Sequence, residues 1–168
     1  MKSEYEVIDN FMDKDDFKNL QSLVMGNDVP WYFTKNINTS PGYDPNSNQS
    51  YLTHHIFNPR LDYVYSTLYK DFYVFLKLLD MKSIMRAKLN LYMRTDKIEE
   101  HNSHTDSSFE HKGCVFSFNT CDGYTKLEDG TKIDSVANRA LIFDASKSHS
   151  STSTTNAKGR FNVNFNYF

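Results

Sequence analysis

Strict alternation of polar and apolar residues near the C-terminus constrains the fold of this 168-residue chain more than any other feature. In residues 160–168 an arginine and three asparagines alternate with large apolar residues. The polar set is Arg160, Asn162, Asn164 and Asn166. A period of two is that of a β-strand with two different faces. Because asparagine disfavours a strand unless its amide has partners, the polar face is either exposed to solvent or one wall of a polar cavity.

The rest of the C-terminal half also predicts β-strands. Residues 87–94 alternate in the same way, and turn signals at Asp122-Gly123 and Asp129-Gly130 separate shorter apolar runs. The further strands are predicted at 113–119, 124–127, 131–134 and 139–143.

The N-terminal half predicts one strand and two helices. A short strand at 5–8 precedes a helix that Asp13 caps and Gly26 ends. A second helix is predicted from Asn58-Pro59, with apolar residues at helical spacing from Leu61 to Leu79. Two helices followed by many short strands predict a mainly β fold with N-terminal helices, a jelly-roll or barrel with both helices packed on one sheet.

The length predicts a single domain over residues 1–168. In it, residues 1–82 form an N-terminal cover and residues 83–168 form the β core. Residues 34–58, rich in Asn, Ser, Pro and Gly, have no periodicity, and this composition is typical of an active-site lid or of a surface loop.

Charge and cysteine content exclude several classes of protein. The net charge is −2, so no global basic field favours nucleic acid or an anionic membrane. The two cysteines, Cys114 and Cys121, are too few for a disulfide framework or a structural zinc site, and we assign neither a catalytic role. The N-terminus lacks the apolar stretch of a secretory signal. We therefore expect a cytoplasmic protein, or one of the host cytoplasm if the chain is viral.

Two histidines and one carboxylate carry the strongest chemical signal. On an extended segment His104 and Asp106 point the same way, and His149 lies just past a later apolar strand. A closed β-barrel can bring these side chains to one mouth. Two histidines and a carboxylate with open positions form the facial triad of non-haem Fe(II) oxygenases, although a zinc hydrolase uses the same ligand types.

Arg160 and Tyr92 favour iron and an acidic cosubstrate. The guanidinium of Arg160 suits a carboxylate of a small diacid, and the hydroxyl of Tyr92 can donate to the same molecule. With these residues, the segment from Leu89 to Phe168 resembles the 2-oxoglutarate and Fe(II)-dependent dioxygenases, and among them the prolyl-4-hydroxylase-like group with its small phage and bacterial members.

The resemblance implies a double-stranded β-helix, the jelly-roll of that family, and a role for each residue. It implies that His104, Asp106 and His149 are the catalytic centre and bind Fe(II), while Arg160 binds the distal carboxylate of 2-oxoglutarate and Tyr92 assists. The cofactors it implies are Fe(II), 2-oxoglutarate as cosubstrate and O₂. Asn162 is assigned to the cosubstrate as well. Arg160-Phe161-Asn162 is also similar to the start of the last strand in nucleic-acid demethylases of the same superfamily, but those continue with Thr and a second Arg where this chain has Asn164 and Asn166, so that subfamily ranks second.

The sequence departs from the prolyl-hydroxylase pattern at two places. Phe118 stands on a strand where many members have tyrosine, and a common Gly-Gly pair is replaced by Asp122-Gly123. Neither change affects the three metal-ligand positions.

The substrate implied by the resemblance is a peptide or protein side chain that enters beneath the 34–58 loop. A small metabolite or a nucleobase is the alternative within the superfamily, and the net charge disfavours nucleic acid. A non-enzymatic cupin-like metal-binding module and a zinc hydrolase are the alternatives from other classes. We expect His54 and His55 to form a surface pair, although they could face substrate, and His101 and His111 to be solvated. We expect residues 148–155, rich in hydroxyls, to form a flexible turn.

Overall fold

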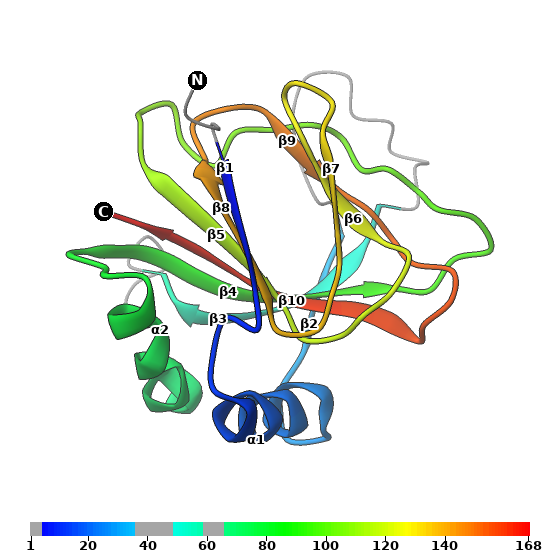
Figure 1. Ribbon diagram of the computed structural model, residues 1–168. Helices are drawn as coiled ribbons and strands as arrows, with labels where there is room; N and C mark the ends of the chain where they lie inside the picture. Colours follow the sequence, from blue (N-terminus) through cyan, green and yellow to red (C-terminus); the bar gives the residue numbers. More distant parts are fainter. Residues whose placement is uncertain (1–4, 36–48, 59–65) are drawn as a thin grey trace.

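Two antiparallel sheets and two helical segments make up the computed structural model, which describes residues 5–35, 49–58 and 66–168 (Figure 1). In this part of the chain the large sheet has the order β1-β8-β5-β10-β4-β3-β2 and the small sheet has the order β7-β6-β9. The N-terminal strands are β1 (Tyr5–Asp9), β2 (Tyr32–Thr34) and β3 (Tyr51–Phe57). The later strands of the large sheet are β4 (Ile84–Met93), β5 (Lys112–Ser117), β8 (Arg139–Asp144) and β10 (Gly159–Tyr167). The small sheet contains β6 (Tyr124–Leu127), β7 (Lys132–Asp134) and β9 (His149–Ser151). The mainly β jelly-roll predicted from the sequence is confirmed.

Helix α1 (Lys14–Met25) begins and ends where the sequence predicts. The Asp13 carboxylate accepts a hydrogen bond from the backbone N–H of Asp15 at 2.8 Å, which caps the first turn. Its buried face carries Leu20 and Val24, and Gly26 follows the last turn. The second helical segment consists of a 3₁₀ helix, η1 (Thr67–Phe72), and the short α2 (Tyr73–Leu78). Its predicted start at residues 59–65 lies outside the described residues.

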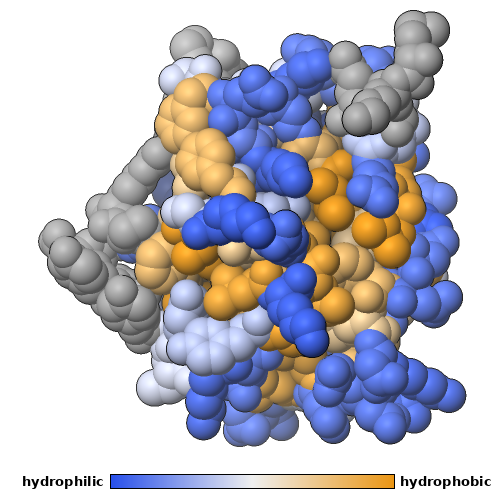
Figure 2. Space-filling model, turned by 60° about the vertical axis from the view of Figure 1, so that its left-hand side comes forward, coloured by the Kyte–Doolittle hydropathy of each residue, from blue (hydrophilic) through white to orange (hydrophobic). Residues whose placement is uncertain are grey.

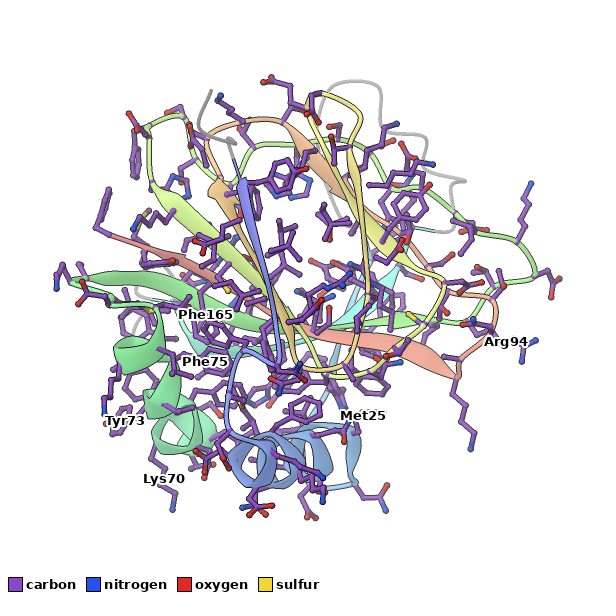
Figure 3. All side chains as sticks on the ribbon, in the orientation of Figure 1. Met25, Lys70, Tyr73, Phe75, Arg94 and Phe165 are labelled. Carbon is purple, nitrogen blue, oxygen red and sulfur yellow. The ribbon has the colours of Figure 1, made fainter. Side chains whose placement is uncertain are left out.

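Both helices pack on the same face of the large sheet, as predicted (Figure 1). Phe75 of α2 lies at the centre of this layer and is fully buried, with its ring 4.7 Å from Phe165 and 5.0 Å from Phe116. Figure 3 shows Phe75 and Phe165 between α2 and the sheet, with Tyr73 directed away. The apolar face of β10 therefore forms the core, and its polar face is left for the opposite side of the sheet.

The prediction of a loop throughout residues 34–58 is wrong for its last part. Residues 51–57 form β3, which pairs with β2 and with β4. The asparagine-rich residues 36–48 lie outside the described residues. His54 is buried, with Nδ1 2.8 Å from the Pro30 carbonyl oxygen and Nε2 2.6 Å from the Ser66 hydroxyl. The predicted surface pair is therefore wrong for His54, whereas His55 is only half-buried.

The helices do not cover the whole large sheet. Figure 2 turns the side with the C-terminal end of β10 forward and shows hydrophobic residues among hydrophilic ones. Phe109 and Phe168 are about half exposed, and their rings stack at 6.1 Å.

No helix among the described residues is long and apolar enough to span a membrane.

We predict that Phe75→Ala lowers the free energy of unfolding by about 3 to 5 kcal/mol, because it opens a cavity between α2 and the sheet. Denaturant unfolding followed by circular dichroism measures the change. Tyr73→Ala, two residues away and 53% exposed, is the control and should cost less than about 1 kcal/mol. Equal losses in the two variants would contradict this account of the core.

Candidate metal centre

His104, Asp106 and His149 lie together at one end of the space between the two sheets. One ligand atom from each residue lies within 4.8 Å of the other two. Nε2 of His104 is 3.7 Å from Oδ1 of Asp106, and Nε2 of His149 is 3.9 Å from Oδ2. These separations allow all three side chains to bind one cation between them.

The backbone fixes this arrangement. His104 and His149 exchange both of their backbone hydrogen bonds at 2.9 Å, and the N–H of Asp106 donates to the Ala145 carbonyl at 3.0 Å. Because positions 104 and 106 flank one residue of extended chain, their side chains fall on the same side. His149 opens β9, and Thr152 is fully buried. The prediction of a flexible turn at 148–155 is therefore wrong.

Hydrogen bonds on the far ring nitrogens orient both histidines. Nδ1 of His149 is 3.0 Å from the Lys147 carbonyl oxygen, and Nδ1 of His104 is 3.5 Å from the Asn102 carbonyl oxygen. A carbonyl only accepts, so in the tautomer assigned from these contacts Nδ1 carries the proton and the lone pair of Nε2 faces Asp106. Burial and the neighbouring His149 lower the pKa of His104 to about 4, so its imidazole is neutral at pH 7. Neutral imidazoles are the form that binds metals.

Asp106 is held as a charged carboxylate. Its Oδ1 accepts a hydrogen bond from Nη2 of Arg86 at 2.7 Å, and its Oδ2 accepts from the amides of Asn166 and Asn164 at 2.8 and 3.2 Å. Burial alone would raise the pKa of Asp106, but the charge of Arg86 and the proximity of His149 hold the pKa far below its ordinary value. Sequence reasoning missed Arg86, although it occupies the polar face of β4.

The pairing of β4 with β10 builds a polar face inside the molecule. Four directly paired rows of side chains line this face. The rows are Arg86 with Asn166, Lys88 with Asn164, Asn90 with Asn162, and Tyr92 with Arg160. Among the described residues, the buried side-chain nitrogen and oxygen atoms without a hydrogen-bond partner all belong to this face. They are Arg86 Nε, Asn90 Oδ1, Arg160 Nε, Asn164 Oδ1 and Asn166 Oδ1. The asparagine face therefore forms part of the wall of polar cavities, and its orphaned atoms are free to bind water or a polar ligand.

Arg160 is a buried cation that lacks a carboxylate partner among the described residues. Its side chain is 1% exposed, and it donates to the Thr125 hydroxyl at 2.9 Å and to the Thr152 carbonyl at 3.4 Å. Gly123 makes room for it, because a Cβ there would lie 2.8 Å from Cδ of Arg160. A buried guanidinium without an anion is costly, so this position fits an anionic ligand.

Tyr92, Asn162 and Arg160 line the same cavity. The sequence-based assignment needs this arrangement, because it gives all three residues one ligand. The guanidinium carbon of Arg160 is 5.7 Å from the centre of the Tyr92 ring, which stacks on Tyr51 at 5.3 Å. Oδ1 of Asn162 accepts from the amide of Asn90 at 2.9 Å. The sequence did not single out Asn90 or Tyr51.

One small cavity joins the His-Asp-His cluster to Arg160. It has a volume of about 40 Å³ and is lined by the cluster together with Arg160, Tyr92 and Asn162. A diacid therefore enters only when lining side chains move. Lys88 is the longest flexible one, and its Nζ donates to the Tyr51 hydroxyl at 3.0 Å. Burial and the charge of Arg86 lower the pKa of Lys88 to about 7.

His101 and His111 are buried, so the prediction that they are solvated is wrong. Nδ1 of His101 lies 2.8 Å from the Ser151 hydroxyl, and its ring packs against Tyr92. Burial and the charge of Arg160 lower the pKa of His101 to about 3. Nε2 of His111 lies 3.1 Å from the amide nitrogen of Asn166. Both histidines therefore contact residues that line the two cavities or bind Asp106. Their position in a charged loop of the sequence did not predict this burial.

Comparison with known sequences identified no family model and no curated protein that matches this chain. Comparison with solved structures did find matches. A 2OG-Fe(II) oxygenase family oxidoreductase from Burkholderia pseudomallei is 10% identical, with a TM-score of 0.64 over 99% of this chain and 85% of that one. The chain has the fold of the 2-oxoglutarate and Fe(II)-dependent oxygenases.

Two prolyl hydroxylases with this fold also match. The enzyme from Trichoplax adhaerens, in complex with a peptide fragment of the hypoxia inducible factor oxygen degradation domain, is 13% identical, with a TM-score of 0.69 over 99% of this chain and 84% of that one. The viral collagen prolyl hydroxylase from Paramecium Bursaria Chlorella virus-1, in complex with 2OG, is 13% identical, with a TM-score of 0.61 over 98% and 96%. At such identities the 2-oxoglutarate oxygenase likeness concerns the fold, so the site must be argued from its own residues.

We predict that His149→Ala weakens binding of Mn(II) or Fe(II) by at least ~100-fold, because it removes one of three clustered donors. Anaerobic isothermal titration calorimetry measures the affinity, and circular dichroism checks the fold. His55→Ala is the matched control, since His55 is half-buried on β3 and lies outside the cluster. Wild-type affinity in His149→Ala would show that the metal binds elsewhere.

Proposed function

We propose that this protein is a 2-oxoglutarate- and Fe(II)-dependent oxygenase that hydroxylates a C–H bond of a peptide or protein side chain. The observation that carries the proposal is Arg160, a buried guanidinium that lines the same cavity as the His-Asp-His cluster. The match to oxygenase structures supports it at the level of the fold.

The proposal gives each residue of the cavity a task. His104, Asp106 and His149 would hold the iron as two nitrogen donors and one oxygen donor, which leaves positions open for other ligands. Arg160 would bind the distal carboxylate of 2-oxoglutarate, with the hydroxyl of Thr125 beside it. Bound together, iron and 2-oxoglutarate supply the oxidation, in which O₂, 2-oxoglutarate and a C–H bond give succinate, CO₂ and a C–OH group.

The remaining residues would align the cosubstrate and exclude water. Tyr92 and Asn162 lie beside Arg160 and offer a hydroxyl and an amide to the middle of a short diacid. The stacked rings of Tyr51 and Tyr92 close one wall, and Phe143 packs edge-on against His149 at 4.8 Å. Aromatic side chains that exclude water lower the local dielectric constant, which would strengthen the charge interactions inside the site.

Arg160 also separates this proposal from the two alternatives that use only a metal. A cupin-like binding module and a zinc hydrolase both use the His-Asp-His cluster, but neither needs an unpaired arginine inside the same cavity. A buried charge without a partner lowers stability by roughly several kcal/mol, as it does when one partner of a buried ion pair is removed. An acidic cosubstrate removes this cost.

A peptide substrate is the finer part of the proposal. One structure with the same fold is a prolyl hydroxylase in complex with a peptide fragment, and this supports a peptide or protein side chain as the class to test first.

We predict that the anaerobic addition of Fe(II) and then 2-oxoglutarate produces the weak visible charge-transfer band of an iron-chelated 2-oxo acid. Arg160→Met should raise the 2-oxoglutarate concentration needed for half of the band at least ~30-fold, because a charge-assisted pair of hydrogen bonds is lost. Fe(II) affinity should change little.

The control is Arg139→Met, since Arg139 pairs with Asp9 at the surface and does not line the cavity. Iron binding without any band in the wild-type protein would contradict the oxygenase proposal and favour a metal-binding module or a hydrolase.

A further inference from the structure

Asp106 also lines a second cavity, whose other lining residues differ from those of the cosubstrate cavity. This second cavity has a volume of about 300 Å³ and is lined by Arg86, Asp106 and Asn166 among others. Within residues 5–35, 49–58 and 66–168, only Asp106 lines both cavities. None of the residues assigned to 2-oxoglutarate lines the second cavity, so a molecule there would lie next to Asp106 without displacing the cosubstrate.

The polar groups of this second cavity have unused hydrogen-bonding capacity. The Arg86 side chain is 26% exposed, and its Nη2 donates to Asp106, while its buried Nε has no partner. Asn166 is 2% exposed, and its amide nitrogen serves Asp106, while its Oδ1 has no partner. Two residues that line the cavity therefore each carry a buried polar atom without a partner: a guanidinium N–H that needs an acceptor and an amide oxygen that needs a donor.

The balance of charge favours an anion as the acceptor. Arg86 and Arg160 are permanent cations, Lys88 is a third basic group, and among the described residues Asp106 is the only carboxylate that lines either cavity. The two charges of Fe(II) and the two of 2-oxoglutarate cancel when both are bound. The loaded site then keeps at least one positive charge without a counter-ion, which a bound anion would neutralise.

We propose that the cavity beside Arg86 binds the substrate through a carboxylate on Arg86 and an N–H on Asn166, so that the substrate is a peptide with an acidic residue next to the hydroxylated one. This inference rests on the proposed oxygenase function. A carboxylate matches the planar fork of a guanidinium, and a peptide backbone supplies the N–H that Asn166 Oδ1 lacks. A phosphate group offers the acceptor but no such donor.

The test measures succinate release by the iron-loaded wild-type protein with defined peptide pools. Randomised hexapeptide pools that hold Asp or Glu at one fixed position are compared with matched pools that hold Asn or Gln there. The acidic pools should raise succinate release above the peptide-free rate at least tenfold more than the amide pools do. Equal stimulation by the two sets, or stimulation by neither, would overturn the proposal.

A further arm contains free aspartate and glutamate in place of peptides. Stimulation by the acidic pools alone supports a peptide, whereas equal stimulation by the free amino acids would overturn the peptide part. The charge-transfer band with 2-oxoglutarate is recorded on the same preparation. If the band is absent, the oxygenase function fails; if it is present without a preference for acidic pools, only this inference fails.

Variants assign the preference to Arg86. For each variant, stimulation by the acidic pools and by the amide pools is measured over that variant's own peptide-free rate. The ratio of acidic to amide stimulation should fall to about one in Arg86→Gln. It should stay above one in Arg86→Lys. Arg94→Gln is the control, because Arg94 is exposed and directed outward (Figure 3). An unchanged ratio in Arg86→Gln would show that the preference, where present, arises elsewhere.

Discussion

The antiparallel pairing of β4 with β10 is the interaction on which the rest of the structure depends. It runs from Met93 opposite Gly159 to Ile84 opposite Tyr167, with one irregularity near its end. Because side chains alternate along both strands, this one ladder places the phenylalanines of β10 against the helices and the asparagines on the opposite side. A slip by one residue would bury the asparagines in the apolar core, so the apolar packing around Phe75 also secures the register of the polar face.

The polar face concentrates electrostatic cost in one place. It contains the buried Arg160 and all the orphaned buried side-chain atoms found among the described residues, and it holds the charged Asp106 by hydrogen bonds. Structures retain such groups where a ligand compensates them, and buried unpartnered polar atoms are otherwise uncommon. Arg86 and the amides of Asn164 and Asn166 keep Asp106 ionised and oriented before any ligand binds. The Asp106 carboxylate is therefore preorganised for a nearby cation, whereas the proposed anion beside Arg160 requires lining side chains to move.

The sequence predicted the fold and the cluster well because both rest on regular patterns. The period of two located β4 and β10, and the spacing of His104 and Asp106 placed both side chains on one side of an extended segment. The same reasoning missed β3, because Thr53, His54 and His55 interrupt its apolar residues with polar ones. It also failed for His101 and His111, since the burial of a loop residue follows from its tertiary contacts and leaves no periodic trace. Arg86 was missed for a related reason: a charged residue on a strand more often faces solvent, and its hydrogen bond to Asp106 is a tertiary contact that the sequence pattern does not show.

The central claim is that one cavity holds both a metal on the His-Asp-His cluster and a dicarboxylate on Arg160. An anaerobic crystal structure of the protein with Mn(II) and 2-oxoglutarate tests it most directly, with the anomalous signal locating the metal. The account predicts a single manganese within coordination distance of His104, Asp106 and His149, and the distal carboxylate of 2-oxoglutarate against Arg160. Manganese at another position, a fourth protein ligand that closes the metal site, or a dicarboxylate that leaves Arg160 without an anion would contradict it.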